Sequence, residues 1–98
     1  MSRRAAPHTI VAAALLASCA RPLSDDECHA MLERYVELLV QSDRPDVKAD
    51  ELARLKLEAH KKAAHDPAFS TCRKDVSRHA FECAMRASNA DQLEQCLL

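Results

Sequence analysis

Apolar residues that follow residue 24 recur at steps of three and four, the period of an α-helix with one buried face. Ser24 and Glu27 have the spacing of a capping box, and the acidic residues between them suit the start of a helix. The pattern predicts a helix over residues 25–41. Its wide apolar stripe contains Cys28, Met31, Leu32, Tyr35 and Leu39, with Val36 and Leu38 at the edges.

A second helix is predicted over residues 47–65. The segment before it contains Pro45, and a proline disfavours a helical conformation at the preceding residue. Apolar positions then recur at helical steps, while the other faces of the segment are charged. The apolar positions are Leu52, Leu55, Ala59 and Ala63.

A third helix is predicted over residues 68–87, and a short last helix over 90–98 with Asn89 as its cap. One face of the third helix carries Phe69, Cys72, Val76, Ala80, Cys83 and Ala87. Residues 24–98 are therefore expected to form an all-α domain. Its predicted architecture is a small antiparallel three-helix bundle plus a short C-terminal helix.

Composition favours the same fold. The chain has no glycine, few aromatic residues and much Ala, Leu, Glu, Lys and Arg, which are strong helix formers. So small a domain buries a modest core and usually needs covalent support. The net charge is −1, a weak charge that gives no steering toward nucleic acid, so no nucleic-acid partner is expected.

The N-terminal segment has the parts of an export signal. Arg3 and Arg4 precede an apolar stretch over residues 9–18, which has about half the length needed to span a bilayer. The run Leu16-Ala17-Ser18-Cys19 resembles a bacterial lipobox. The resemblance implies that residues 1–18 are a lipoprotein signal peptide and that Cys19 is lipidated. Cleavage after Ala20, or no cleavage, remains the alternative.

A lipidated Cys19 would make residues 19–23 a tether to the membrane, since two or more acyl chains anchor a protein firmly. No acidic residue follows Cys19 immediately. By resemblance to the sorting rules of enteric bacteria, this implies a lipid-anchored protein at the outer membrane that faces the periplasm.

Lipidation of Cys19 leaves four cysteines, an even number that indicates two disulfides in an exported protein. In an up-down-up bundle, Cys28 and Cys72 lie in first turns at the same end. Cys83 lies near the other end. The last helix runs back from that end, which places Cys96 at about the same height in the bundle as Cys83. The predicted disulfides are Cys28–Cys72 and Cys83–Cys96. The first is expected to stabilise the fold by roughly 3–4 kcal/mol.

The reactive residues suggest two kinds of site, a metal site and a catalytic site. Cys28, His29, Cys72, His79 and Cys83 offer ligands for a metal-handling protein, but an exported protein favours disulfides over the thiolates this needs. No arrangement of catalytic residues is recognisable, and a phosphate-binding glycine loop requires glycine. We therefore expect no enzyme activity and no cofactor.

Three surface features remain. His60 and His65 are expected to be solvated. The basic residues Arg54, Lys56, Lys61 and Lys62 form either a solvated face, which interspersed acids favour, or a contact with anionic lipid. Phe81 and Met85, opposite the cysteine face of the third helix, either pack under the last helix or form a partner-binding patch.

The C-terminal third carries a further resemblance. It contains Cys72-x10-Cys83, the run Glu82-Cys83-Ala84-Met85, and then Asp91-x-Leu93-Glu94-x-Cys96. This part of the chain is similar to small four-cysteine helical lipoproteins of myxobacterial type, whose activity is uncharacterised. The sequence thus predicts a non-enzymatic cell-envelope lipoprotein that acts as an interaction or structural module with an envelope protein as partner. The alternative is a periplasmic metal-handling protein.

Overall fold

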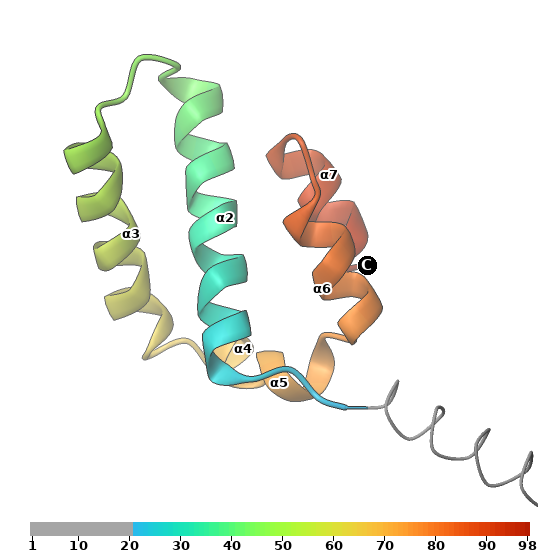
Figure 1. Cartoon of the computed structure of the whole chain (residues 1–98). Coiled ribbons are helices and arrows are strands. Elements are labelled where there is room, and N and C mark those ends of the chain that lie inside the picture. The colour runs from blue at the N-terminus through green and yellow to red at the C-terminus, as the bar shows by residue number, and fades with distance from the viewer. Residues whose placement is uncertain (1–20) are drawn as a thin grey trace, which may run out of the picture.

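The computed structural model describes residues 21–98, which form six helices and no strand (Figure 1). The all-α fold with two disulfides is confirmed. In chain order the helices are α2 (Asp25–Asp43), α3 (Ala49–Ala63), α4 (Pro67–Ser70), α5 (Cys72–Asp75), α6 (Arg78–Met85) and α7 (Ala90–Cys96).

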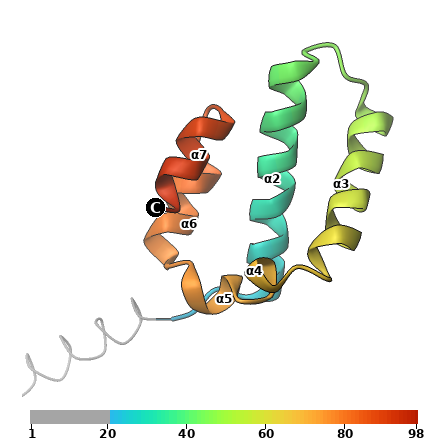
Figure 2. The same cartoon turned by 180° about the vertical axis from the view of Figure 1, so that it is seen from behind.

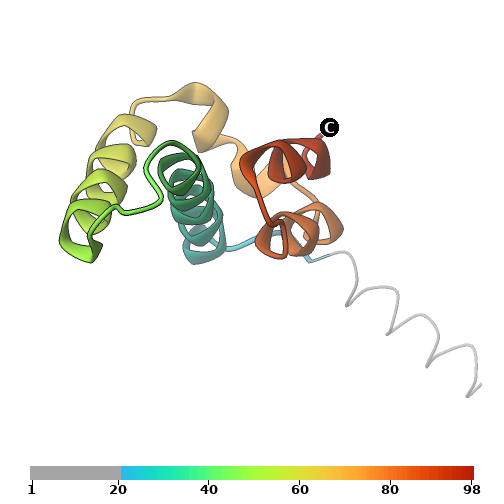
Figure 3. The same cartoon turned by 90° about the horizontal axis from the view of Figure 1, so that it is seen from above.

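Helix α2 is the centre of the domain. Helix α3 runs antiparallel to it on one side, and the hairpin of α6 and α7 stands on the other side (Figures 1 and 3). The two short helices α4 and α5 cross beneath one end of α2 and connect the two sides. Helix α2 therefore contacts both sides of the domain, and much of its apolar stripe is shared between them.

The predicted continuous helix over 68–87 is wrong, because this segment is divided into α4, α5 and α6. The first break is at Thr71, which lies between α4 and α5 with φ −97° and ψ 4° and whose hydroxyl donates to the Ala68 carbonyl. The second break is at Val76, which is extended, with φ −95° and ψ 119°. It is followed by Ser77, whose side chain accepts a hydrogen bond from Ala80 N and caps α6. Such bonds from side chains to the backbone compete with helix continuation, so the chain turns twice before it runs alongside α2.

The described part of the predicted tether belongs to the folded domain. Leu23 is 1% exposed and lies in the same buried cluster as Cys28. This is the arrangement of a hydrophobic staple, in which the residue before the N-cap packs on the fourth residue of the helix. Arg73 Nε also donates to the Leu23 carbonyl at 3.1 Å. The ordered domain therefore begins before residue 24, and the expectation that the tether extends to residue 23 is corrected.

The two disulfides are those that the helix geometry predicts. Cys28–Cys72 joins α2 to α5, with the Cα atoms 6.2 Å apart. Cys83–Cys96 joins α6 to α7, with the Cα atoms 5.7 Å apart. Helix α3 carries no cysteine, so it is attached through packing, ion pairs and its loops.

Candidate functional site

An apolar groove lies over α2 between α3 and α7. Its lining includes residues of α4, which lies at the lower end of α2 in Figure 2. The groove has a volume of about 550 Å³. We call it the apolar groove and define it by Met31, Leu32, Tyr35 and Leu39 of α2, Phe69 of α4 and Leu97 after α7.

The groove exists because the apolar stripe of α2 is wider than its neighbours cover. Met31 is buried, whereas Leu39, two turns further along, is 44% exposed. Helices α3 and α7 pack against opposite sides of α2, so the middle of the stripe faces the space between them. Because it is concave and mostly apolar, this groove is a candidate binding surface.

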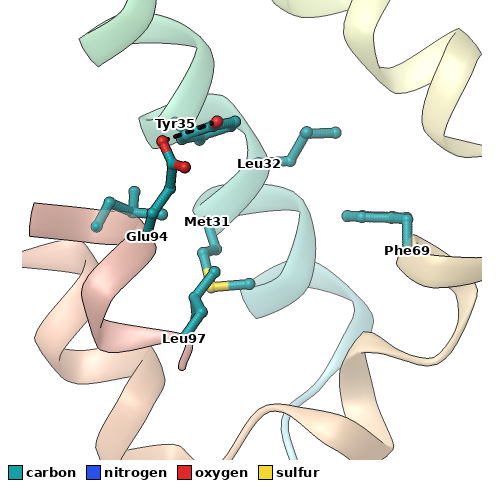
Figure 4. A pocket seen from close by; sticks show the side chains of 7 residues that line it. Met31, Leu32, Tyr35, Phe69, Glu94 and Leu97 are labelled. Carbon is teal, nitrogen blue, oxygen red and sulfur yellow. Dashed lines mark hydrogen bonds between the residues drawn. The ribbon is translucent and has the colours of Figure 1, made fainter. Parts of the chain in front are cut away.

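Figure 4 shows how the side chains line the inner part of the groove. Leu32 and Phe69 face each other across the gap, and Met31 lies beside Leu97. The Tyr35 hydroxyl donates a hydrogen bond to Glu94 Oε2 at 3.2 Å. Burial raises the pKa of Tyr35, and the charge of Glu94 raises it further. The hydroxyl therefore keeps its proton and holds the rim of α7 against α2.

The rim of the groove is more negative than positive. Asp66 and Asp75 border its base, and Glu94 borders it on α7. Among residues 21–98, none of these three carboxylates forms an ion pair. Lys62 of α3 is the basic residue in the lining. The rim thus has three carboxylates against one ammonium group.

A second pocket, of about 520 Å³, lies against Phe69 and contains both His29 and His60. His60 Nε2 is 2.9 Å from Glu33 Oε2, and its ring meets the ring of His29 edge-on, with the centroids 4.9 Å apart. The His29 ring stacks on Phe69 at 5.7 Å. The expectation that His60 is solvated is therefore wrong, since its side chain is 25% exposed and joins α3 to α2.

His65 is exposed, as expected. The engagement of His60 depends on Glu33, which comes from a different helix, so helical periodicity alone does not reveal it.

The five candidate metal ligands do not form a metal site in the described residues. The structure places all four cysteines in disulfides, which removes the thiolates that such a site needs. His29 packs on Phe69, and His79 is exposed on α6. Within residues 21–98, no three His, Cys, Asp or Glu side chains are arranged to hold a metal ion.

The basic row on α3 is interrupted by carboxylates. Lys56 Nζ lies 3.1 Å from Glu37 Oε2, and this hydrogen bond is the main cause that lowers the pKa of Glu37. Arg54 Nη1 lies 2.8 Å from Glu58 Oε1. Lys61 and Lys62 remain exposed. This pairing fits a solvated face better than a contact with anionic lipid.

Phe81 and Met85 are partly buried and pack against the core cluster. Their positions favour the packing alternative over an exposed patch. Leu39 of α2, in contrast, is 44% exposed, although the sequence pattern assigns it to the apolar stripe of that helix. The signal was the width of this stripe, which also contains Leu32 and Tyr35.

Neither family models nor curated proteins nor solved structures give a match to this chain. The helices of residues 21–98 all lack the combination of length and apolar character needed to cross a membrane. Cys19, the predicted lipidation site, lies outside the described residues.

Proposed function

We propose that this protein is a non-enzymatic, lipid-anchored module of the bacterial cell envelope that binds another envelope protein in the apolar groove. The observation that carries the proposal is the groove itself, with Leu39 left 44% exposed above an apolar floor. Concave, mostly apolar surfaces with few polar groups are typical binding sites. Burial of such a surface by a partner is favourable because it removes apolar area from water.

Rigidity supports a binding role. The Cys28–Cys72 disulfide fixes α2 to α5 beneath it, and Cys83–Cys96 fixes α6 to α7. The floor of the groove and its α7 wall are therefore held in place before a partner arrives. Such preorganisation lowers the entropy that binding must overcome.

The predicted lipid anchor on Cys19 favours a partner that lies at the membrane. Leu23 is packed in the core, so only three residues separate it from Cys19. A fully extended chain covers at most about 14 Å from Cys19 to Leu23. Lipidation of Cys19 would therefore keep the α4–α5 end of the domain close to the bilayer, where membrane proteins and their short soluble segments are concentrated.

Two exposed leucines allow a matched test. Leu39 lies in the groove, whereas Leu57 is 57% exposed in a different depression beside α3. Tagged wild type, Leu39→Asp and Leu57→Asp would be cross-linked in intact cells, purified from the envelope and compared by mass spectrometry. We expect one prominent partner with wild type and Leu57→Asp and its loss with Leu39→Asp. Equal recovery with all three proteins would refute a role for the groove.

A further inference from the structure

We infer that the occupant of the apolar groove is a short amphipathic helix that carries basic residues beside its apolar face. The inference rests on the proposed function, because it names the class of partner for the same groove. It is carried by the length of the groove, by the helices that form its walls and by the charges on its rim.

The length of the groove limits the occupant. Its floor runs along α2 from Met31 to Leu39, and eight residues of helix rise about 12 Å. Phe69 of α4 also lines the groove. A groove of this length accommodates about two turns of helix, whose apolar side chains recur at steps of three and four.

The walls favour a helix over an extended peptide. Residues of α2 line the floor and residues of α3 and α7 line the sides, so a further helix could pack there as in a helix bundle. An extended peptide usually binds by adding a strand to the edge of a sheet. Residues 21–98 contain no strand, so the described domain offers no such edge.

The charges on the rim of the groove indicate the sign of the partner's charge. Asp66, Asp75 and Glu94 lack an ion pair within residues 21–98, and Lys62 offsets one of these charges. On the α2–α3 interface, by contrast, Glu37 is paired with Lys56. Carboxylates that have no cationic partner and surround an apolar surface favour a cationic ligand and penalise an anionic one.

Two synthetic peptides of about 12 residues serve as probes. Both have the same leucine stripe at helical spacing, and the remaining positions are lysine in one and glutamate in the other. Binding would be measured by fluorescence anisotropy with the full-length Cys19→Ser chain, its two disulfides intact. Because this variant cannot be lipidated at residue 19, the result does not depend on the anchor.

We expect the lysine peptide to bind at least about tenfold more tightly than the glutamate peptide at low salt, with the difference shrinking as salt screens the rim. Neutral variants of the same shape should remove the preference. The test variant combines Asp66→Asn, Asp75→Asn and Glu94→Gln. The control with the same change in charge combines Asp46→Asn, Asp50→Asn and Glu82→Gln, and it should keep the preference.

The Leu39→Asp variant distinguishes a failure of this inference from a failure of the proposed function. If both peptides bind equally and Leu39→Asp abolishes binding, the groove is a docking site but the inferred charge of the partner is overturned. If neither peptide binds, or Leu39→Asp has no effect, the helical occupant is overturned. If the protein self-associates and Leu39→Asp abolishes this, the groove binds a second copy of the chain. If it binds free palmitate and Leu39→Asp abolishes this, the groove binds an acyl chain. Either result would also overturn the inference.

Discussion

Arg78 of α6 holds Glu27 of α2 through two hydrogen bonds, Nη1 to Oε2 at 2.7 Å and Nη2 to Oε1 at 2.9 Å. The same carboxylate accepts a hydrogen bond from Ser24 N at 2.9 Å and completes the capping box of α2. Arg78 Nη2 also donates to the Pro22 carbonyl at 3.3 Å. One residue pair therefore caps the central helix, ties α6 to it and fixes the chain where it enters the domain.

Because Arg78 binds the ionised form of Glu27, we predict that the fold loses stability in acid. The hydrogen bond from Arg78, followed by that from Ser24, lowers the pKa of Glu27 from its ordinary 4.5 to about 2. Because the folded-state pKa lies below the unfolded value, ionised Glu27 stabilises the fold above about pH 4.5, and this contribution is lost as the pH falls toward 2.

Urea unfolding at pH 6 and pH 3 measures this effect. Glu27→Gln should show a smaller drop in the free energy of unfolding between the two pH values than wild type, whereas Asp46→Asn should match wild type. An equal drop in Glu27→Gln would show that Glu27 does not contribute to the acid response.

The disulfides should differ in their contributions to stability. Cys28–Cys72 spans 44 positions and Cys83–Cys96 spans 13. In the chain-entropy model, these loops correspond to about 4 and about 3 kcal/mol. Paired replacement by alanine, Cys28→Ala with Cys72→Ala or Cys83→Ala with Cys96→Ala, should reduce the free energy of unfolding in that order. Peptide mapping of unreduced wild type that joined Cys28 to any cysteine other than Cys72 would contradict the fold.

Phe81 and Met85 should contribute to stability. Both are partly buried against the core, so Phe81→Ser with Met85→Ser removes packed apolar volume. In a domain of this size we expect the melting temperature to fall by roughly 5 °C or more. The exposed Leu57→Ser serves as the control and should change it little. An unchanged melting temperature with loss of partner capture would restore the partner-patch alternative for these two residues.

Cys19 should carry the lipid. Radiolabelled palmitate is expected in wild type and not in Cys19→Ser, and the variant should be lost from the membrane fraction. Cys83→Ala with Cys96→Ala is a control for loss of cysteine and should still be labelled. If wild type and Cys19→Ser were recovered equally in the membrane without label in either, the lipobox prediction would be wrong.

Local signals in the sequence accounted for much of the fold. The capping box of Ser24 and Glu27, the helical periodicity and the level of each cysteine along its helix led to α2, α3, α7 and both disulfides. The same reasoning missed the breaks in the third helix. Ser77 is a typical N-cap residue, but the apolar spacing across it, from Val76 to Ala80, favours a continuous helix. The burial of Leu23 depends on its packing with Cys28 and other core residues, which the helical period after residue 24 does not reveal.

The existence of the groove could not be predicted from the helical periodicity alone. The stripe that includes Met31, Tyr35 and Leu39 was predictable, but its exposure depends on how far apart α3 and α7 stand across α2. That separation follows from the crossing of α4 and α5 beneath the bundle, which a continuous third helix would not produce. The partnership of His60 with Glu33 likewise depends on the packing of α3 against α2.

Site-specific photo-crosslinking tests the groove as a binding site most directly. A benzophenone amino acid would replace Leu39 in one variant and Leu57 in the other, and intact cells would be irradiated before the envelope is isolated. We predict an adduct at position 39 that mass spectrometry maps to a basic amphipathic segment of one envelope protein, and no such adduct at position 57. The same adducts at both positions, or none at position 39, would contradict the account.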